Sequence, residues 1–356
     1  MTTARTLSLE ALSARVEEIF VNVGLTADQA GAMARVIVAG ERDGAKSHGI
    51  HRLEGCLTTL RAGKVSASAV PKLQEDESAI VRVTARGGFA CAAFELGLPH
   101  LVEGVRQFGL AALVINDAAH FSALWYEVEA LAEQGLAALA MCPSYSTVAP
   151  AGGSAPLLGT NPIAFGWPRE DGPPYVFDFA TSMAARGEIE LHRRSGKPLP
   201  EGWAVDADGR PTTDPDAALA GAMLPFGGHK GSALSTMIEL MAGALIGDRS
   251  SGDALDAIGT TSLIPTHGEL VLAFDPAQFA AGRGTDPFGQ AETLFEAIVG
   301  QGARLPSQRR YAARERTMAH GVTLTAAEMD QLDRYQALGL DGVSQRRTDV
   351  SSEREA

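Results

Sequence analysis

The feature that most constrains the fold is a series of short apolar segments in the middle of the chain, separated by loops rich in glycine and proline. Segments of this length and composition are typical of strands that are buried in a sheet. An alternating segment at 79–84 predicts one half-buried strand before them. The expected buried strands are 113–115, 137–141, 163–165, 176–179 and 270–275. The sequence therefore predicts an α/β protein built on a central sheet.

Helical patterns surround these strands. Residues 8–23 form an amphipathic pattern, and Thr26-Ala27-Asp28-Gln29 resembles a capping box that opens a second helix. Residues 231–246 are apolar almost all round, which predicts a buried helix, and 193–217 are polar and predict a surface flap. Further helices are expected at 89–108, 288–300 and 307–317, whereas 247–268 show no clear periodicity.

Four regions follow from this pattern. We expect a helical N-terminal region, 1–110, that carries the candidate histidine. A sheet domain spans 111–305, helices at 306–343 pack back on the N-terminal region, and 344–356 form a frayed tail.

Charge and cysteine content exclude several classes of partner. The 356 residues include 30 Lys+Arg and 43 Asp+Glu, a net charge of −13 that would repel nucleic acid and anionic membranes. No apolar run approaches the roughly 18 residues of a membrane span, and the N-terminus does not resemble a signal peptide, so we expect a cytoplasmic protein. Cys56, Cys91 and Cys142 are isolated in apolar surroundings, which predicts reduced core thiols and excludes a CxxC redox or zinc motif.

The strongest candidate site is the segment Lys46-Ser47-His48-Gly49-Ile50-His51-Arg52. Apolar residues follow at helical spacing, and serine is a common N-cap, so we expect a helix to begin at Ser47. His48 and Arg52 then lie one turn apart, where an imidazole can supply a proton and a guanidinium can hold a carboxylate. The alternative is an ordinary capped helix with solvated His48 and Arg52.

No common nucleotide motif is present. The chain lacks the G-x-G-x-x-G of a Rossmann fold, because Gly282-Arg283-Gly284-Thr285-Asp286-Pro287 has proline at the third glycine, and it lacks a Walker A lysine. Gly227-Gly228-His229-Lys230-Gly231 places two cations and free N–H groups at the start of the apolar helix. This turn predicts a phosphate-binding nest, or else a structural turn that needs its glycines.

Several motifs in order along the chain resemble the type-2 malate/L-lactate dehydrogenase family. That resemblance implies nicotinamide oxidoreductase activity on a non-Rossmann fold with a mainly antiparallel or mixed sheet. It also implies a homodimer, with dimerisation through region 1–110 and NAD(P) binding by the sheet domain 111–305. Two of the motifs are most similar to members of the family that reduce cyclic imino acids with NADPH. The motifs are Ser47-His48-Gly49, His120–Trp125, Gly159–Gly166, Asp178–Ser182, Pro225–Gly231 and Arg304-Leu305-Pro306.

The resemblance implies a role for each matching residue. His48 would be the proton donor with Ser47 as its partner, and no residue would bind a metal. Arg52, Thr160, Arg186 and Gly187 would bind the substrate. The cofactor would be bound by His120, Phe121, Ser122, Ala123, Leu124, Asp178, Phe179, Ala180, His229, Lys230, Arg304, Leu305, Pro306, Ser307, Gln308, Arg309 and Arg310. The chain departs from the imine-reductase pattern at Arg186, where histidine is expected, and at Ser307-Gln308, where Gly-Asp is expected.

These roles imply transfer of hydride from NAD(P)H to C2 of a small carboxylate. The expected substrate is Δ1-piperideine-2-carboxylate or Δ1-pyrroline-2-carboxylate, which gives L-pipecolate or L-proline in lysine degradation or proline metabolism. The alternatives are a malate, lactate or sugar-acid dehydrogenase, and a catalytically silent ligand-binding protein. We expect NADPH rather than NADH, because His229, Lys230, Arg304, Arg309 and Arg310 offer cations for the 2′-phosphate.

Overall fold

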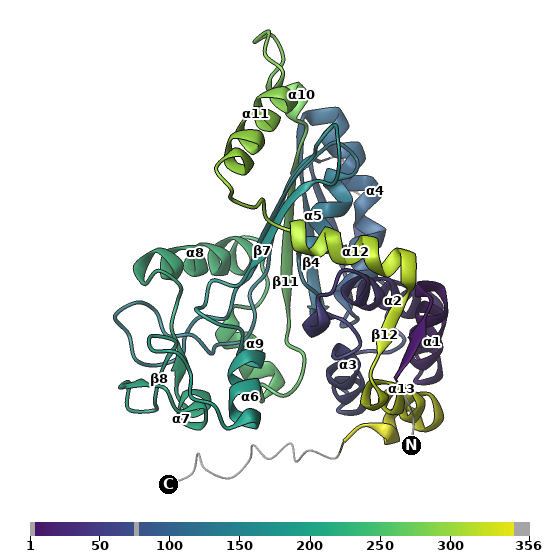
Figure 1. The fold of residues 1–356 in the computed structure, drawn as a ribbon, viewed down its shortest axis with the longest axis vertical. Helices are drawn as coiled ribbons and strands as arrows, with labels where there is room; N and C mark the ends of the chain where they lie inside the picture. The colour runs from purple at the N-terminus through teal and green to yellow at the C-terminus, as the bar shows by residue number, and fades with distance from the viewer. Residues whose placement is uncertain (1–3, 75–77, 345–356) are drawn as a thin grey trace.

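A mixed sheet forms the centre of the computed structural model, which describes residues 4–74 and 78–344 (Figure 1). Within these residues seven strands lie in the order β2-β3-β4-β11-β5-β6-β7, and the β3–β4 pair is parallel while the others are antiparallel. The expected mixed sheet is confirmed. The strands are β2 (Lys72–Gln74), β3 (Ile80–Thr84), β4 (Leu110–Ala119), β5 (Ala137–Met141), β6 (Ile163–Trp167), β7 (Tyr175–Phe179) and β11 (Thr266–Phe274).

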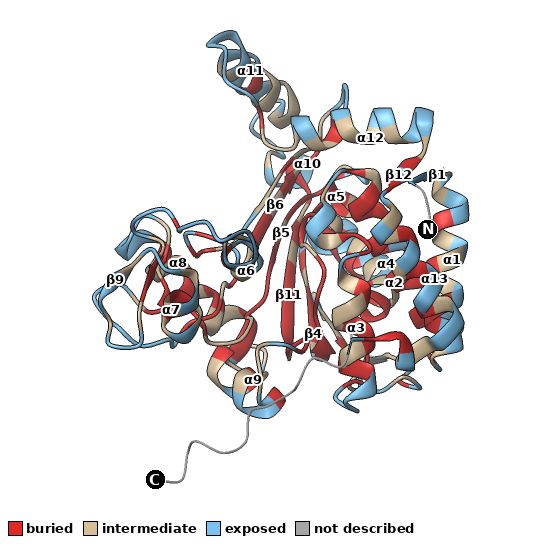
Figure 2. Ribbon diagram, turned by 60° about the horizontal axis from the view of Figure 1, so that its bottom comes forward, coloured by how far each residue is buried: buried red, intermediate tan, exposed pale blue. Residues whose placement is uncertain are grey.

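Two helices pack closely on this sheet because glycine stands at each contact. A Cβ at Gly97 of α4 (Ala90–Phe108) would lie 2.5 Å from Cδ1 of Leu113 on β4. A Cβ at Gly166 of β6 would lie 2.5 Å from the Val128 carbonyl oxygen of α5 (Trp125–Ala132). Figure 2 shows the central strands largely buried beside these helices. The sheet and its helices therefore share one dense core, in which small residues allow the backbones to approach.

A helical unit lies beside the sheet and combines both ends of the chain (Figure 1). Strand β1 (Arg5–Leu7) pairs with β12 (Val322–Leu324), and Arg15 of α1 forms an ion pair with Asp333 of α13. Thr26 caps α2 as expected, but Gln29 is buried and donates to the carbonyls of Ala67 and Ala69 instead of closing a capping box. The helices are α1 (Leu9–Asn22), α2 (Ala27–Arg42), α3 (Arg52–Arg61), α13 (Ala326–Leu338) and the short helix η3 (Gly339–Gly342).

A third unit lies on the other side of the sheet, and it differs from the expected flap. Part of segment 193–217 folds into a small sheet with the order β10-β8-β9, and apolar residues such as Ile189, Leu199 and Met223 form a core beneath it. This core was not predicted, because its apolar residues are separated in the sequence by many polar surface residues. The elements are α6 (Arg186–Ser195), β8 (Ala204–Val205), β9 (Pro211–Thr212), α7 (Pro215–Ala220) and β10 (Ala222–Met223).

The apolar segment 231–246 was predicted as one buried helix, and this prediction is wrong. The α-helix α8 (His229–Glu239) passes into a π-helix, η2 (Leu240–Ala244), and Leu240 and Leu245 are 58% and 67% exposed. One side contacts the sheet core through Ile238 and Ala242, whereas the other side is uncovered. Apolar periodicity alone does not reveal which faces are covered.

The remaining helices lie around the edges of the sheet. Segment 247–268, which had no clear pattern, contains α9 (Ser251–Ile258) with a complete Ser250/Asp253 capping box. The others are α10 (Pro276–Phe279), α11 (Pro287–Gly300) and α12 (Gln308–His320). Among the described helices none is long and apolar enough to cross a membrane. The tail predicted at 344–356 lies, after Ser344, outside the described residues.

Candidate active site

The loop that carries the candidate histidine is shaped by a buried glutamate. Glu41 of α2 accepts from the backbone N–H of Ile50 at 3.0 Å and from Lys46 Nζ at 2.5 Å. Glycines permit this approach, because a Cβ at Gly40 would lie 2.6 Å from the His48 carbonyl oxygen and a Cβ at Gly49 would lie 2.0 Å from Glu41 Oε1. Glu41 was not identified from the sequence, where it reads as one more polar residue on an amphipathic helix.

Ser47 does not cap a helix, which corrects the expected helix start. Residues Lys46–His48 form one turn of 3-10 helix, η1, and α3 begins at Arg52 without a side-chain cap. The Ser47 hydroxyl instead lies 3.0 Å from His48 Nδ1, and the Arg52 guanidinium lies 3.0 Å from His48 Nε2. Ser47, His48 and Arg52 are thus joined in one chain of contacts.

This chain fixes the protonation of the imidazole. A guanidinium can only donate, so His48 Nε2 accepts from Arg52 and the ring proton resides on Nδ1, where it donates to Ser47 Oγ. Burial, and then the positive charge of Arg52, lower the pKa of His48 from 6.5 to about 3. In this state His48 is neutral, and Arg52 occupies the lone pair of its Nε2.

Two further polar side chains complete this end of the site. Burial raises the pKa of the Tyr145 phenol, while the charges of Arg186 and Arg52 oppose the shift, so the phenol lies within electrostatic reach of both guanidinium groups. Its hydroxyl donates to the Thr261 carbonyl at 3.0 Å. Arg186 is the first residue of α6, and Gly187 beside it has open space where a Cβ would be. Tyr145 follows β5 in a loop without a motif, so no sequence pattern points to it.

The segment His120–Leu124 lies between β4 and α5, next to this group. Phe121 and Leu124 are buried in the apolar cores, and the Phe121 ring meets Phe89 edge-on at 5.8 Å. Burial lowers the pKa of His120 to about 3, and the charges of Arg52 and His48 contribute. The proton-donor group and His120 are therefore neighbours. Ser122 is buried and Ala123 is partly exposed.

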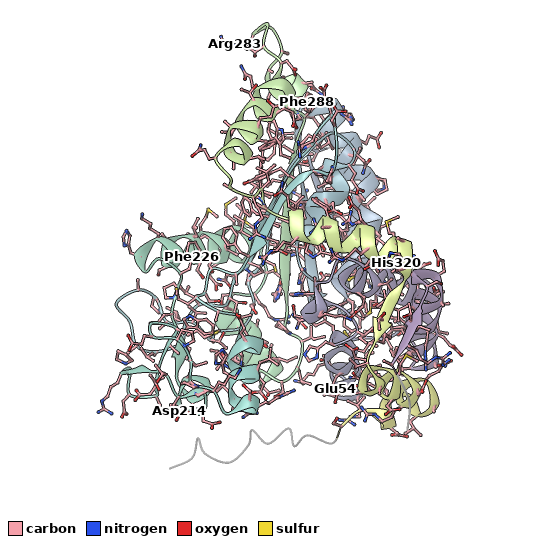
Figure 3. The ribbon with its side chains drawn as sticks, viewed as in Figure 1. Glu54, Asp214, Phe226, Arg283, Phe288 and His320 are labelled. Atoms are coloured by element: carbon pink, nitrogen blue, oxygen red, sulfur yellow. The ribbon has the colours of Figure 1, made fainter. Side chains whose placement is uncertain are left out.

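Asp178 and the residues after it connect this segment to the third unit. Asp178 Oδ2 accepts from the Trp125 backbone N–H at 3.0 Å, and burial raises the Asp178 pKa to about 6. The next two residues lead to Thr181, whose N–H donates to the Thr160 carbonyl at 2.8 Å. Phe179 is 42% exposed and meets Phe226 edge-on at 5.7 Å, just before α8 (Figure 3).

The segment 304–310 folds against β7. Ser307 has a left-handed backbone (φ 64°), which favours glycine and matches the family pattern at this place. Its hydroxyl donates to the Val176 carbonyl at 2.7 Å, and Gln308 Oε1 accepts from the Leu305 N–H at 3.2 Å. These bonds hold the turn. Leu305 is buried and Pro306 is partly exposed.

The cations proposed for the cofactor divide into two groups. Arg310 is engaged by Asp43 at 2.6 Å and by Glu129, and its guanidinium stacks on Trp125 at 4.2 Å. The other cations are exposed, and within residues 4–74 and 78–344 they have no ion-pair partner. This free group consists of His229 and Lys230 at the start of α8, Arg304, and Arg309 at the start of α12.

Comparisons with known proteins identify relatives over nearly the whole chain. The family model described as malate/L-lactate dehydrogenase matches residues 7–333. A Δ1-pyrroline-2-carboxylate reductase of Agrobacterium fabrum is 67% identical over 345 residues, covering 97% of this chain and 100% of the relative. A Δ1-pyrroline-2-carboxylate/Δ1-piperideine-2-carboxylate reductase of Pseudomonas aeruginosa is 60% identical, covering 83% of this chain and 89% of the relative.

Solved structures show the same fold. The crystal structure of Δ1-piperideine-2-carboxylate reductase from Pseudomonas syringae pv. tomato superposes with a TM-score of 0.89 at 42% identity, covering 93% of this chain and 99% of that one. Malate dehydrogenase from Entamoeba histolytica shares the fold, with a TM-score of 0.83 at 21% identity over 94% of this chain and 98% of that chain.

Proposed function

This chain belongs to the malate/L-lactate dehydrogenase family of oxidoreductases, and from that premise we propose that it reduces a cyclic 2-imino acid. The substrates proposed are Δ1-pyrroline-2-carboxylate and Δ1-piperideine-2-carboxylate, and the products are L-proline and L-pipecolate. The main support is the 67% identity to a Δ1-pyrroline-2-carboxylate reductase over 97% of the chain. The chain of contacts Ser47–His48–Arg52 supports the same reaction, since it joins a proton carrier to a carboxylate-binding group.

The residues around the site fit a nicotinamide dinucleotide. Exposed cations without ion partners among the described residues suit a pyrophosphate and a 2′-phosphate in a chain of net charge −13. Gly228 has a left-handed backbone (φ 62°), and no atom lies within 4 Å of where its Cβ would be. The backbone at the start of α8 can therefore approach a phosphate closely. When bound, the cofactor supplies the hydride that reduces C2.

The protein's own part in the reaction is charge pairing and proton supply. Arg52 would form a two-pronged contact with the substrate carboxylate, with Arg186 and Thr160 beside it. Once Arg52 donates to that carboxylate, His48 Nε2 loses its hydrogen-bond donor and gains a nearby anion, which raises its pKa. His48 can then carry a proton toward the substrate nitrogen. As the C=N bond becomes a C–N bond, the nitrogen takes up that proton.

A substrate screen tests the proposal. Purified protein is mixed with NADPH and one acid at a time, and nicotinamide oxidation is followed by absorbance. We expect turnover with the two cyclic imino acids, and little with pyruvate alone or with pyruvate plus methylamine. Faster turnover of 2-oxo acids would favour a malate, lactate or sugar-acid dehydrogenase. Binding of acids without any turnover would favour a silent ligand-binding protein.

We also propose three finer properties that the sequence suggested. The cofactor is NADPH, the protein acts in the cytoplasm, and it forms a homodimer. The cation set supports the first property and the three buried free thiols support the second. The exposed apolar side of α8 and η2, with Leu240 and Leu245, supports the third. Light scattering coupled to size exclusion measures the oligomeric state.

A further inference from the structure

A cluster of three buried ionisable side chains lies behind the candidate site. His120 follows β4, Glu127 lies on α5 and Glu269 lies on β11. Their relative exposures are 7%, 2% and 1%, and one ligand atom of each lies within 4.8 Å of the others. Two carboxyl groups buried beside one imidazole are unusual, because an isolated buried charge is strongly unfavourable. The arrangement therefore requires a specific explanation.

The carboxyl oxygens in this cluster lack conventional donors. Among the described residues, Glu127 Oε2 and both Glu269 oxygens are buried without a hydrogen-bond partner. His120 Nε2 lies 3.5 Å from Glu269 Oε2. On the His120 ring, Ser122 Oγ lies 3.4 Å from Nε2 and Cys142 Sγ lies 3.9 Å from Nδ1. Glu269, Ser122 and Cys142 thus all lie around the His120 imidazole.

We propose that Glu269, supported by Glu127, is a positioning residue that fixes the orientation of the His120 ring and thereby the cofactor-binding segment His120–Leu124. This inference rests on the proposed function, since it takes His120 to contact the nicotinamide cofactor. The carboxyl group of Glu269 supplies the proton in a hydrogen bond to His120 Nε2. One carboxyl oxygen of Glu127 lies within 4.8 Å of the ligand atoms of Glu269 and His120, and Glu127 keeps a proton of its own, so that neither buried carboxyl group carries an isolated charge.

Electrostatics supports the protonated form. Burial raises the pKa of Glu269 to about 8 and holds the pKa of Glu127 well above its usual range. Burial lowers the pKa of His120 to about 3, so the ring is neutral and can accept from a carboxyl group. The titratable groups that face this pair are His120, Cys142 after β5, Cys91 on α4, Asp178 on β7 and His267 on β11.

A bound cation is the competing explanation. One imidazole and two carboxylates also form a plausible donor set for a divalent metal, and a metal would neutralise both charges. The two explanations differ in what the purified protein contains. The proposal requires protons and no metal, so the metal content of the purified protein is part of the test.

The first experiment compares two substitutions of Glu269 by titration of NADPH fluorescence. Glu269→Leu removes the donor, and we expect the dissociation constant for NADPH to rise by about tenfold or more. Glu269→Gln keeps a donor and an acceptor in the same shape, and we expect it to recover most of the lost affinity. Glu103→Leu, an exposed change from glutamate to leucine on α4, is the matched control. Thermal unfolding of each variant verifies that the protein is folded.

A double-mutant cycle separates positioning from a general structural effect. If Glu269 acts through His120, Glu269→Leu should change NADPH affinity by less than about twofold in a His120→Asn background. If Glu269→Leu fails to fold, two measurements still test the proposal. They are the NADPH affinity of Glu127→Gln and the pH dependence of NADPH affinity. NADPH affinity of the natural protein should fall above pH 8, where Glu269 ionises, and this fall should be absent in Glu269→Gln.

Three results would overturn the inference. They are natural NADPH affinity in folded Glu269→Leu, additive effects in the cycle, and one equivalent of metal that Glu269→Gln no longer retains. A natural protein that binds no nicotinamide cofactor would instead refute the proposed function. The NADPH titration of the natural protein detects that outcome before any variant is tested.

Discussion

The Arg52 guanidinium lies 3.0 Å from His48 Nε2, so the carboxylate-binding group and the proton carrier occupy each other in the free protein. A substrate carboxylate that draws Arg52 away frees the imidazole nitrogen and favours its protonation. Binding of the substrate carboxylate and protonation of His48 are thereby linked. A ligand without a carboxylate leaves His48 neutral, with its pKa near 3.

Replacing His48 should remove the proton supply and little else. We expect His48→Ala to lower kcat by about 10²–10⁴-fold, the usual effect of losing a general acid, with NADPH affinity nearly unchanged. Steady-state kinetics and a fluorescence titration measure the two quantities. His100→Ala, an exposed histidine on α4, is the control. Near-normal turnover in His48→Ala would rule out His48 as the proton donor.

Arg52→Lys should weaken substrate binding. A single ammonium cannot reproduce a two-pronged contact with a carboxylate, so we expect the KM for the imino acid to rise by about tenfold or more. The KM for NADPH should stay constant, since Arg52 is assigned to the substrate. Lys64→Arg, an exposed change in the loop after α3, controls for exchange of the two cations. An unchanged KM for the acid would count against this role.

The buried Glu269 also predicts how stability depends on pH. Its folded pKa is about 8 against 4.5 for the ordinary side chain, so between these values the folded protein binds the extra proton. Its contribution to stability is therefore fully present below pH 4.5 and is lost as the pH rises to 8, by about 1.4 kcal/mol per pH unit. Glu269→Gln lacks this loss.

Denaturant unfolding from pH 5 to pH 8 measures the difference. The stability of Glu269→Gln relative to the natural protein should increase steadily with pH. Groups far from Glu269 titrate alike in both proteins and cancel in the comparison, whereas Glu127, whose pKa Glu269 helps to raise, contributes to the pH dependence together with Glu269. A difference that does not vary with pH would show that Glu269 is already ionised at pH 5.

The free cations predict a preference for NADPH. A 2′-phosphate adds about two negative charges, and His229, Lys230, Arg304 and Arg309 have no ion partner among the described residues. We expect kcat/KM for NADPH to exceed that for NADH by tenfold or more, about 1.4 kcal/mol, at one ionic strength. A ratio near or below one would contradict the assignment.

The fold was largely predictable because its main elements have a clear local pattern. Strands 137–141 and 270–275 are short apolar runs, and both are found in the sheet. The first has its expected bounds, and the second begins earlier, at Thr266, and ends at Phe274. The buried sides of segment 231–246 were not predictable, because an apolar helix has the same sequence pattern whether a sheet or solvent lies beside it. The small β8–β10 sheet was missed because its strands are two residues long.

The residues of the site were harder to predict from the sequence than the fold. Ser47, His48 and Arg52 could be grouped because they are close along the chain. Glu41 and Tyr145 act across space from residues with ordinary neighbours, and no spacing rule links them to His48. Arg310 was grouped with the cofactor cations, but in the fold it is engaged by Glu129 and by Asp43, which is 267 positions away. Tertiary contacts of this kind leave no periodic signal.

A direct competition between two substrates tests the central claim. Equal concentrations of Δ1-pyrroline-2-carboxylate and pyruvate are offered to the protein with limiting NADPH, and L-proline and lactate are quantified. The ratio of products measures the ratio of the two kcat/KM values. We predict that L-proline accounts for nearly all of the product. Lactate as the main product would contradict the proposed function.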